Sequence, residues 1–524
     1  MRITDLLDQP FGTIPDLIRA YAASQPDHPA LIQGARSLDY RGLDALMDRI
    51  AAALQRDGLR PRDTIAICAG TSIDYAALFL GALRAGVAVA PLAPSSTADS
   101  LAAMIADSGA RLLFIDAGSG AILTNAGENI GMPRVALDNS GDIDACLPWD
   151  DWLGNPGARP AGVTPEPDWP LNIIYSSGTT GTPKGIMQPF SMRWMHVQRA
   201  RPNGYGTDAV TLLSTPLYSN TTLVSFFPAI AMGGAIVLMA KFDAAAYLAL
   251  AQRHRVTHTM LVPVQYQRLM AHPDFGRYDL SSFHMKFCTS APFSAALKAD
   301  ILERWPGGLI EYYGMTEGGG TCILAAHEYP GKLHTVGQPA PGHDIRLIDE
   351  DGREAAPGEI GEVAGHSGAM MSGYYNQPDK TAEAEWFDRS GKRFIRTGDL
   401  GRFDQDGFLT LLDRKKDMII SGGFNIYPSD LEAVLRGNRE VAEAAVVGVP
   451  SPVWGETPVG FVVLKAESAF SAAQLLAWAN ERLGKTQRLA AVELTASLPR
   501  SAIGKVLKRE LRDGYATAQA KKIR

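Results

Sequence analysis

Short apolar runs alternate with amphipathic helical patterns over much of the chain. Between residues 60 and 115, apolar runs at 64–69, 88–92 and 110–116 surround a helical pattern at 72–86. The alternation returns after residue 170, with apolar runs at 209–216, 235–242, 257–263 and 284–291 and helical patterns near 222–232, 244–255 and 294–305. Strands that alternate with helices in this way are typical of mostly parallel sheets. The pattern therefore predicts two α/β subdomains.

The pattern changes in the last third of the chain. From about 331 to 412, Gly-rich short segments predict a small β-rich subdomain. After Asp413 a mixed pattern begins, in which capping boxes at Ser429 and Ser471 open helices and strands are expected at 444–450 and 460–465. We therefore predict an α/β fold with a large N-terminal domain, 1–413, that holds the two α/β subdomains and the β-rich one. A small mobile α+β domain, 414–524, follows it.

The composition of the chain limits the kinds of molecule and environment with which the protein is expected to interact. The 524 residues carry a net charge of -6, so no strongly basic surface is available for nucleic acid. The apolar stretch 223–240 has the minimum length of a membrane span, but Pro228 and the pair Gly233-Gly234 favour a buried helix, a turn and a strand. Neither a disulfide framework nor a Cys zinc site is expected from the four scattered cysteines, Cys68, Cys146, Cys288 and Cys322. We expect a cytoplasmic protein without stable membrane insertion, and a homodimer remains open.

The most specific motif is a loop rich in small and hydroxyl residues, IIYSSGTTGTPKG at 173–185. Small residues let backbone N–H groups approach phosphate oxygens, and a lysine adds positive charge. The loop is not a Walker A motif, because the GxxxxGK[ST] spacing fails after Gly178. The motif predicts a phosphate-binding loop formed by Ser176, Ser177, Gly178, Thr179, Thr180, Gly181 and Lys184.

Further motifs follow in order along the chain: YYGMTE at 312–317, TGDL at 397–400, DRKKD at 413–417 and PRSAIGK at 499–505. Together with the loop they resemble the AMP-forming adenylating superfamily, which contains acyl-CoA and aryl-CoA synthetases, carrier-loading adenylation domains and beetle luciferases. The resemblance covers nearly the whole chain. It implies that ATP activates a carboxylic acid as an acyl-AMP, that coenzyme A then accepts the acyl group, and that Mg²⁺ is required.

The resemblance also implies a role for each motif residue. Lys505, Thr316 and Glu317 are the implied catalytic residues: Lys505 bridges the substrate carboxylate and the α-phosphate, Thr316 donates to the α-phosphate, and Glu317 is the Mg²⁺ ligand. Asp399 accepts from the ribose hydroxyls, and Arg414 is a second ribose or phosphate contact. By the same resemblance, Tyr313 and the turn Ser290-Ala291-Pro292 form the adenine slot, and Gly314 and Met315 are the remaining ATP-binding residues.

The C-terminal residues are expected to serve the second step. Lys416 falls at the superfamily's hinge, 414–417, so rotation there would withdraw Lys505 after adenylation. Ser421, Gly422 and Gly423 would then line a narrow tunnel for the pantetheine arm of coenzyme A, although the glycine pair is also consistent with a turn.

The acyl pocket departs from common family patterns. The chain reads PLYS at 216–219 where many acyl- and aryl-CoA ligases have PLFH, and Phe424 stands where several relatives have Glu. Aromatic and apolar walls with a few hydroxyl and amide groups favour an aromatic or arylpropenoic acid, with a medium-chain fatty acid as the alternative. The expected lining residues are Tyr218, Ser219, Thr222, Phe226, Gln265 and Thr289.

Other functions are weaker but open. An adenylating enzyme could load a separate carrier protein in place of coenzyme A. A P-loop kinase would release ADP, and the failed Walker spacing argues against it. A nucleotide-binding regulator without catalysis would not need Glu317, Asp399 and Lys505 together, and all of them are present.

Overall fold

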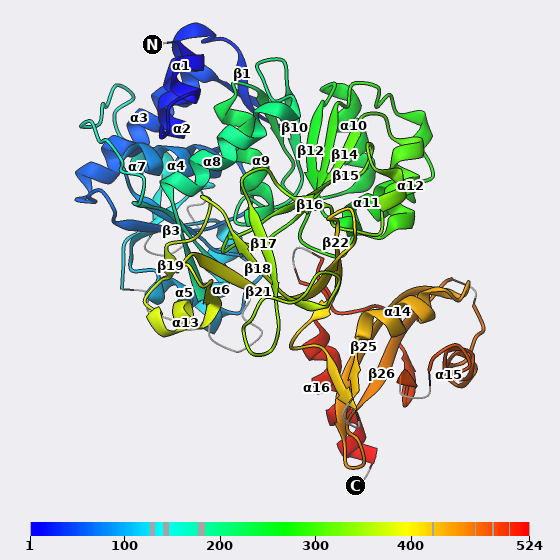
Figure 1. The fold of residues 1–524 in the computed structure, drawn as a ribbon. Coiled ribbons are helices and arrows are strands. Elements are labelled where there is room, and N and C mark those ends of the chain that lie inside the picture. Colours follow the sequence, from blue (N-terminus) through cyan, green and yellow to red (C-terminus); the bar gives the residue numbers. More distant parts are fainter. Residues whose placement is uncertain are drawn as a thin grey trace. The chain divides into compact units, whose positions relative to one another are not determined.

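The computed structural model describes residues 2–125, 131–139, 146–176, 184–421, 424–466, 468–484, 487–501 and 504–522. The chain forms two compact units (Figure 1). The first consists of Met1–His334, Pro339–Asp344 and Gly365–Ile395, and the second of Thr335–Gln338, Ile345–Ala364 and Arg396–Arg524. Part of the β-rich region therefore groups with the C-terminal residues, and the predicted domain boundary at 413 stays a prediction.

A nine-stranded sheet has the order β16-β15-β14-β13-β12-β10-β11-β1-β2. Its neighbours from β11 to β14 pair in parallel, as the alternation of strands and helices predicts. The strands are β1 Pro29–Gln33, β2 Arg36–Asp39, β10 Val210–Leu213, β11 Ala235–Leu238, β12 His258–Leu261, β13 Met285–Cys288, β14 Gly308–Tyr313, β15 Cys322–Ala325 and β16 Gln338–Pro339. The helices of this part are α8 Phe190–Ala200, α9 Asn220–Ala231, α10 Ala244–Arg253, α11 Pro263–Met270 and α12 Ala295–Arg304. Short 3₁₀ turns occur at Arg201–Asn203, Phe275–Arg277 and Pro330–Lys332.

An eight-stranded sheet has the order β19-β9-β8-β4-β3-β5-β6-β7. Its strands are β3 Thr64–Cys68, β4 Ala88–Pro91, β5 Ala110–Ile115, β6 Arg134–Ala136, β7 Cys146–Pro148, β8 Pro170–Ser176, β9 Lys184–Pro189 and β19 Gly373–Tyr374. The helices of the first unit outside 184–304 are α1 Ile3–Leu7, α2 Ile14–Ser24, α3 Tyr40–Arg56, α4 Ile73–Arg84, α5 Ala98–Asp107, α6 Ala117–Asn125, α7 Trp149–Leu153 and α13 Pro378–Ala384. Two separate sheets, each with parallel pairs, confirm the prediction of two α/β subdomains.

One hydrophobic core takes side chains from both sheets, such as Ile67 of β3 and Ile236 of β11, and from helices α3, α4 and α9. Helix α4 is buried along its whole length, which explains why its sequence is apolar on every side. It packs closely on α3, because a Cβ on Gly81 would lie 2.6 Å from Cγ2 of Ile50.

The apolar stretch 223–240 forms the end of α9, a turn and β11. Pro228 lies inside α9, and Gly233 turns the chain with a φ of +84°. The predicted helix, turn and strand are therefore confirmed. In the described part of the chain, no helix combines the length and the apolar character that crossing a membrane requires.

Two smaller five-stranded sheets complete the fold. One has the order β17-β18-β21-β20 with β22 paired to β21, and the other β24-β23-β26-β25 with β27 paired to β26. Their strands are β17 Asp344–Ile348, β18 Gly361–His366, β20 Glu385–Phe387, β21 Arg393–Phe403, β22 Leu409–Arg414, β23 Ile419–Ser421, β24 Phe424–Ile426, β25 Val441–Ser451, β26 Gly455–Leu464 and β27 Ala491–Leu494. The strands predicted at 444–450 and 460–465 are thus confirmed.

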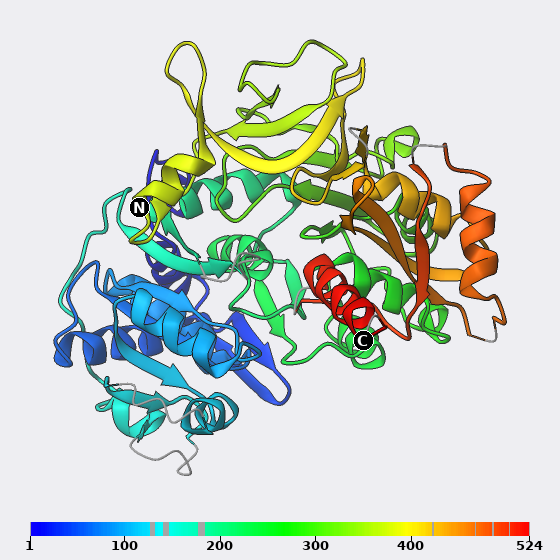
Figure 2. The same cartoon turned by 90° about the horizontal axis from the view of Figure 1, so that it is seen from below.

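Alternate side chains of β25 point to opposite faces of the C-terminal sheet. Val446 belongs to a core with helices α14, Pro428–Arg436, and α15, Ala472–Asn480. Val447 belongs to a core with helix α16, Lys508–Lys522. Figures 1 and 2 show α15 and α16 on opposite sides of this sheet.

Only one of the two predicted capping boxes is correct. Ser471 caps α15, and Gln474 returns the hydrogen bond to its backbone. Helix α14 instead begins at Pro428 with Tyr427 as N-cap, because proline fits the first helical position and starts the helix two residues earlier. Glu432, predicted to close the Ser429 box, accepts a 2.9 Å hydrogen bond from the backbone N–H of Val446.

A buried ion pair supports the strand that leads into the YYGMTE motif. Lys298 of α12 pairs with Glu311 of β14, and their side chains are 1% and 5% exposed. Lys298 also donates to the Leu333 carbonyl over 2.8 Å. Burial raises the pKa of Glu311 to about 7, and Lys298 opposes that shift.

We predict that Lys298→Met destabilises the protein by about 3–5 kcal/mol, because it leaves the buried Glu311 carboxylate without its partner. Lys298→Met combined with Glu311→Leu should recover most of that loss, since an apolar pair needs no compensation. Urea unfolding of the two variants and the wild type measures the difference. Equal losses in the single and double variants would contradict the role of the pair.

Candidate active site

The phosphate-binding loop is described only at its two ends. Ser177, Gly178, Thr179, Thr180 and Gly181 lie outside the described residues. Ser176 ends β8 and Lys184 begins β9, and the two residues are partners in an antiparallel ladder. The predicted loop is therefore the connection of a β-hairpin, although its phosphate contacts stay a prediction.

Tyr374 joins two of the predicted site residues. Its hydroxyl donates a 2.8 Å hydrogen bond to Oε1 of Glu317. The Lys184 ammonium lies 4.8 Å from the centroid of the Tyr374 ring. Burial, together with Glu317, raises the pKa of Tyr374 far above its ordinary value, so the hydroxyl remains a donor. The structure thus brings Lys184 and Glu317 together around a tyrosine that the sequence analysis missed.

The segment from Thr316 to Gly319 is held on several sides. Gln188 of β9 donates to the Thr316 carbonyl over 2.6 Å, and the Met371 N–H donates to the Glu317 carbonyl over 2.8 Å. Gly318 has a φ of +76°, and a Cβ there would lie 2.2 Å from the Ala369 carbonyl oxygen. Glycine is therefore required at 318 both for its conformation and for the close approach of Ala369.

The predicted adenine-slot residues follow adjacent parallel strands. Ser290 comes after β13 and Tyr313 ends β14, and Thr289 donates to the Tyr312 carbonyl over 2.8 Å. Loops at the carboxyl ends of neighbouring parallel strands are the usual place for ligands in α/β sheets. Gly314 and Met315 continue from Tyr313, and Ala291 and Pro292 continue from Ser290.

Ser290 has an unusual backbone. Its φ of +81° is rare for a residue with a Cβ, and its hydroxyl lies 2.6 Å from the Thr221 hydroxyl at the start of α9. Strain of this kind persists where the surroundings hold it and is concentrated at functional sites. The contact also links the predicted adenine slot to the predicted acyl-pocket helix.

The expected acyl-pocket residues differ in burial and in the hydrogen bonds that their polar groups make within the protein. Thr222 is fully buried, and its hydroxyl lies 2.7 Å from Oγ1 of Thr215 and 2.6 Å from the Pro216 carbonyl. Gln265 donates to Ser214 and accepts from the Val262 N–H. Phe226 is fully buried, whereas Tyr218 and Ser219 are half-buried. Contact of any of these residues with an acid stays a prediction.

The second unit holds the remaining predicted residues. Asp399 of β21 and Arg414 of β22 are ladder partners and form a 2.9 Å ion pair. Burial, with smaller contributions from Arg414 and Lys416, lowers the pKa of Lys505 to about 8, whereas Asp399 opposes the shift. Lys505 therefore shares one electrostatic environment with the predicted ribose and hinge residues. Ser421 ends β23, and Gly422 and Gly423 lie outside the described residues.

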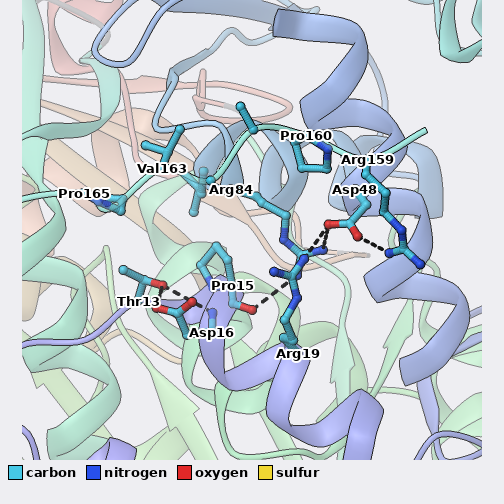
Figure 3. Close-up of a pocket in the computed structure, with 13 residues that line it drawn as sticks. Thr13, Pro15, Asp16, Arg19, Asp48, Arg84, Arg159, Pro160, Val163 and Pro165 are labelled. Atoms are coloured by element: carbon cyan, nitrogen blue, oxygen red, sulfur yellow. Dashed lines mark hydrogen bonds and ion pairs between the residues drawn. The ribbon is translucent and has the colours of Figure 1, made fainter. Parts of the chain in front are cut away.

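A separate pocket of about 310 Å³ lies between the start of α2, helices α3 and α4, and the segment 159–165 (Figure 3). None of the predicted site residues lines it. Asp48 accepts from Arg19 over 2.5 Å and from Arg84 over 2.9 Å, and it also pairs with Arg159. The lining carries three arginines and two aspartates, and Asp44 of α3 also pairs with two of these arginines, so we assign the pocket to the ion pairs that join these elements.

We predict that Tyr374→Phe slows acid-dependent exchange of pyrophosphate into ATP about tenfold, because Glu317 loses the donor that orients it. The Mg²⁺ concentration for half-maximal exchange should rise as well. Tyr375→Phe is the matched control, since its hydroxyl lies beside Gly109 and away from Glu317. Equal rates and equal Mg²⁺ dependence in the two variants would show that Tyr374 does not orient Glu317.

Known proteins and family models match this chain over most of its length. The family model for AMP-binding enzymes matches residues 18–375, and the model for the AMP-binding enzyme C-terminal domain matches 430–505. The chain is 34% identical over 499 residues to a feruloyl-CoA synthase of Amycolatopsis sp, which covers 94% of this chain and 96% of that protein. It is 32% identical over 514 residues to the fatty acid–[acyl-carrier-protein] ligase ScoC of Streptomyces coeruleorubidus, with 96% of each chain covered.

The fold agrees with these matches. The crystal structure of ATP-bound MatB from Rhodopseudomonas palustris superposes with a TM-score of 0.84 at 28% identity, over 96% of this chain and 99% of that one. The chain therefore belongs to the AMP-binding enzyme family, the family of the AMP-forming acyl- and aryl-CoA ligases.

Proposed function

We propose that this enzyme converts an aromatic or arylpropenoic acid first to its acyl-AMP and then to its acyl-CoA. The observation that carries the proposal is the grouping of Lys184 and Glu317 around Tyr374, with Glu317 on the segment that follows the carboxyl end of β14. This grouping suits a reaction in which pyrophosphate leaves. The similarity to a feruloyl-CoA synthase over nearly the whole chain supports the choice of acid.

In the first step a carboxylate oxygen of the acid attacks the α-phosphorus of ATP, and pyrophosphate departs. Both reactants are anions, so the site must supply positive charge and hydrogen-bond donors. Lys184 and Lys505 provide ammonium groups, and Thr316 provides a hydroxyl. Glu317 fits Mg²⁺, because this ion is commonly held by one or two carboxylates together with substrate phosphates. Mg²⁺ bound there would neutralise charge on the pyrophosphate.

In the second step the sulfur of coenzyme A attacks the acyl carbon, and AMP departs. We propose that rotation at Lys416 withdraws Lys505 and presents the segment that contains Ser421, Gly422 and Gly423. Lys416 lies two residues after Arg414, the last residue of β22, where the strand stops and the backbone can change direction. Asp399 and Arg414 would hold the ribose through both steps.

A protein-bound thiol is the second candidate acceptor. The relative ScoC is named as a fatty acid–[acyl-carrier-protein] ligase, and it matches this chain over a similar length and at a similar identity to the feruloyl-CoA synthase. This similarity also keeps a medium-chain fatty acid as the alternative substrate. The acid and the acceptor must therefore be tested together.

We predict that 4-coumarate, ferulate or benzoate gives a higher kcat/KM than hexanoate, octanoate and decanoate, with coenzyme A as acceptor. The products should be AMP and pyrophosphate, and pyrophosphate exchange into ATP should proceed without coenzyme A. A coupled AMP assay over this panel, with coenzyme A or a carrier protein as acceptor, measures the preference. An alkanoate that exceeds every aromatic acid by about tenfold, equal to about 1.4 kcal/mol, would overturn the aromatic assignment. Release of ADP would overturn the adenylation itself.

We predict that kcat/KM of the exchange reaction falls as the pH rises through about 8, because the Lys505 pKa of the free enzyme is lowered to about 8 and the charged ammonium is lost above it. Lys505→Arg should shift this basic limb upward, since guanidinium stays protonated. Lys505→Ala should slow exchange by orders of magnitude yet spare thioester formation from supplied acyl-AMP. A basic limb that stays near pH 8 in Lys505→Arg would assign it to another group.

A further inference from the structure

Arg193 of α8 is a charged side chain buried in the first unit, and the proposed mechanism gives it no role. Its residue is 0% exposed. Burial lowers its pKa to about 9, which still leaves the guanidinium charged at neutral pH. In the described part of the chain, no carboxylate forms an ion pair or hydrogen bond with it. A buried cation without an acid is costly, so its other contacts must compensate it.

The compensation comes from amide side chains and a ring. The Arg193 guanidinium donates to Oδ1 of Asn172 over 3.2 Å, to Oδ1 of Asn220 over 2.9 Å and to Oε1 of Gln188. It also lies 5.3 Å from the centroid of the Phe227 ring. Asn172 Nδ2 donates to the same Gln188 oxygen over 2.8 Å. These hydrogen bonds fix which end of the Gln188 amide is oxygen and which is nitrogen.

The fixed amide points its nitrogen at the active-site loop. With its oxygen held by Arg193 and Asn172, Gln188 directs Nε2 to the Thr316 carbonyl, 2.6 Å away. The other branch reaches Asn220, the first residue of α9, which carries the predicted acyl-pocket residues. Arg193 therefore connects the backbone of a proposed catalytic residue with the start of the acyl-pocket helix.

We propose that Arg193 is a positioning residue for adenylation, acting through Gln188 on Thr316 and through Asn220 on α9. The proposal rests on the role proposed above for Thr316. Charge-assisted hydrogen bonds are stronger and more directional than neutral ones, which suits a group that sets the geometry of others. The Gln188 branch should affect the rate of the chemical step, and the Asn220 branch should affect binding of the acid.

Gln188→Glu tests the first branch. The carboxylate keeps acceptors for Arg193 and Asn172, but its second oxygen faces the Thr316 carbonyl without a hydrogen to donate, so kcat of pyrophosphate exchange should fall roughly thirtyfold. Gln188→Met removes the same donor without adding charge and should show a similar loss. The KM for the acid should change less than about threefold in both variants, because Arg193 still holds Asn220 over 2.9 Å and only the weaker 3.4 Å contact of Gln188 with Asn220 is lost. Loss in Gln188→Glu but not in Gln188→Met would overturn positioning, because the added charge would then be the cause.

Arg193→Met tests whether Arg193 acts on Thr316 through Gln188. It should lower kcat in the wild-type background but by less than about threefold in the Gln188→Met background, because the two changes break the same link and leave no buried carboxylate behind. Asn220→Ala should instead raise the KM for the acid. The matched control is Arg84→Met, which removes another buried arginine, one that pairs with Asp44 and Asp48 away from the predicted site. That control should lower the melting temperature and leave kcat of the folded enzyme unchanged.

The outcomes separate this proposal from the proposed function. Exchange in the wild type together with wild-type kcat in both Gln188 variants would overturn the positioning role alone. Additive losses in the double variant would also overturn it. If Arg193→Met does not fold, the two Gln188 variants and Asn220→Ala decide the question. Absence of exchange with every acid in the wild type would instead overturn the proposed function.

Discussion

Close contact between two backbone segments is the constraint on which the predicted site depends. The chain after Glu317 passes so near the segment 365–369 that a Cβ on Gly318 or on Gly365 would lie 2.2 Å from an atom of the opposite backbone. Side chains cannot enter this contact, so it defines the path of the loop before any substrate is present. Glu317 and Thr316 lie on this loop. Tyr374 of β19 orients Glu317, and Gln188 of β9 orients Thr316, each through a hydrogen bond.

The positive charges of buried arginines are compensated in two different ways in the first unit. Near α2, α3 and α4, the buried arginine charge is matched by aspartates, because Arg84 pairs with both Asp44 and Asp48. Around Arg193 the compensation comes from amides and a ring instead. A surplus positive charge in the interior is useful where anionic reactants must meet, whereas a neutral cluster only joins helices. The two arrangements therefore suit different tasks.

The sequence predicted the regular elements well because their hydrophobic periods are strong. The strands around β12 and β25 and the helix, turn and strand of 223–240 follow directly from such periods. The motif residues were recognisable because their chemistry is concentrated in short segments. Tyr374 was not, since it lies 57 residues from Glu317, and the contacts that bring it near are non-local: the antiparallel pairing of β19 with β9 and the hydrogen bond from Met371 to Glu317. Likewise, the partners of Gln188 come from four separate segments, and no local pattern reveals which amide faces which.

The contact between α3 and α4 has a consequence for how relatives of this chain can diverge. The position of a Cβ on Gly81 lies within 2.7 Å of the Cβ of Ile50, so shortening Ile50 to valine or alanine does not make room for even a methyl group. At this helix spacing one member of the pair must be glycine. In homologues that keep this helix spacing, positions 50 and 81 are therefore expected to covary. The glycine can stand at either position, with a larger residue at the other. Homologues with two larger residues must hold the helices further apart.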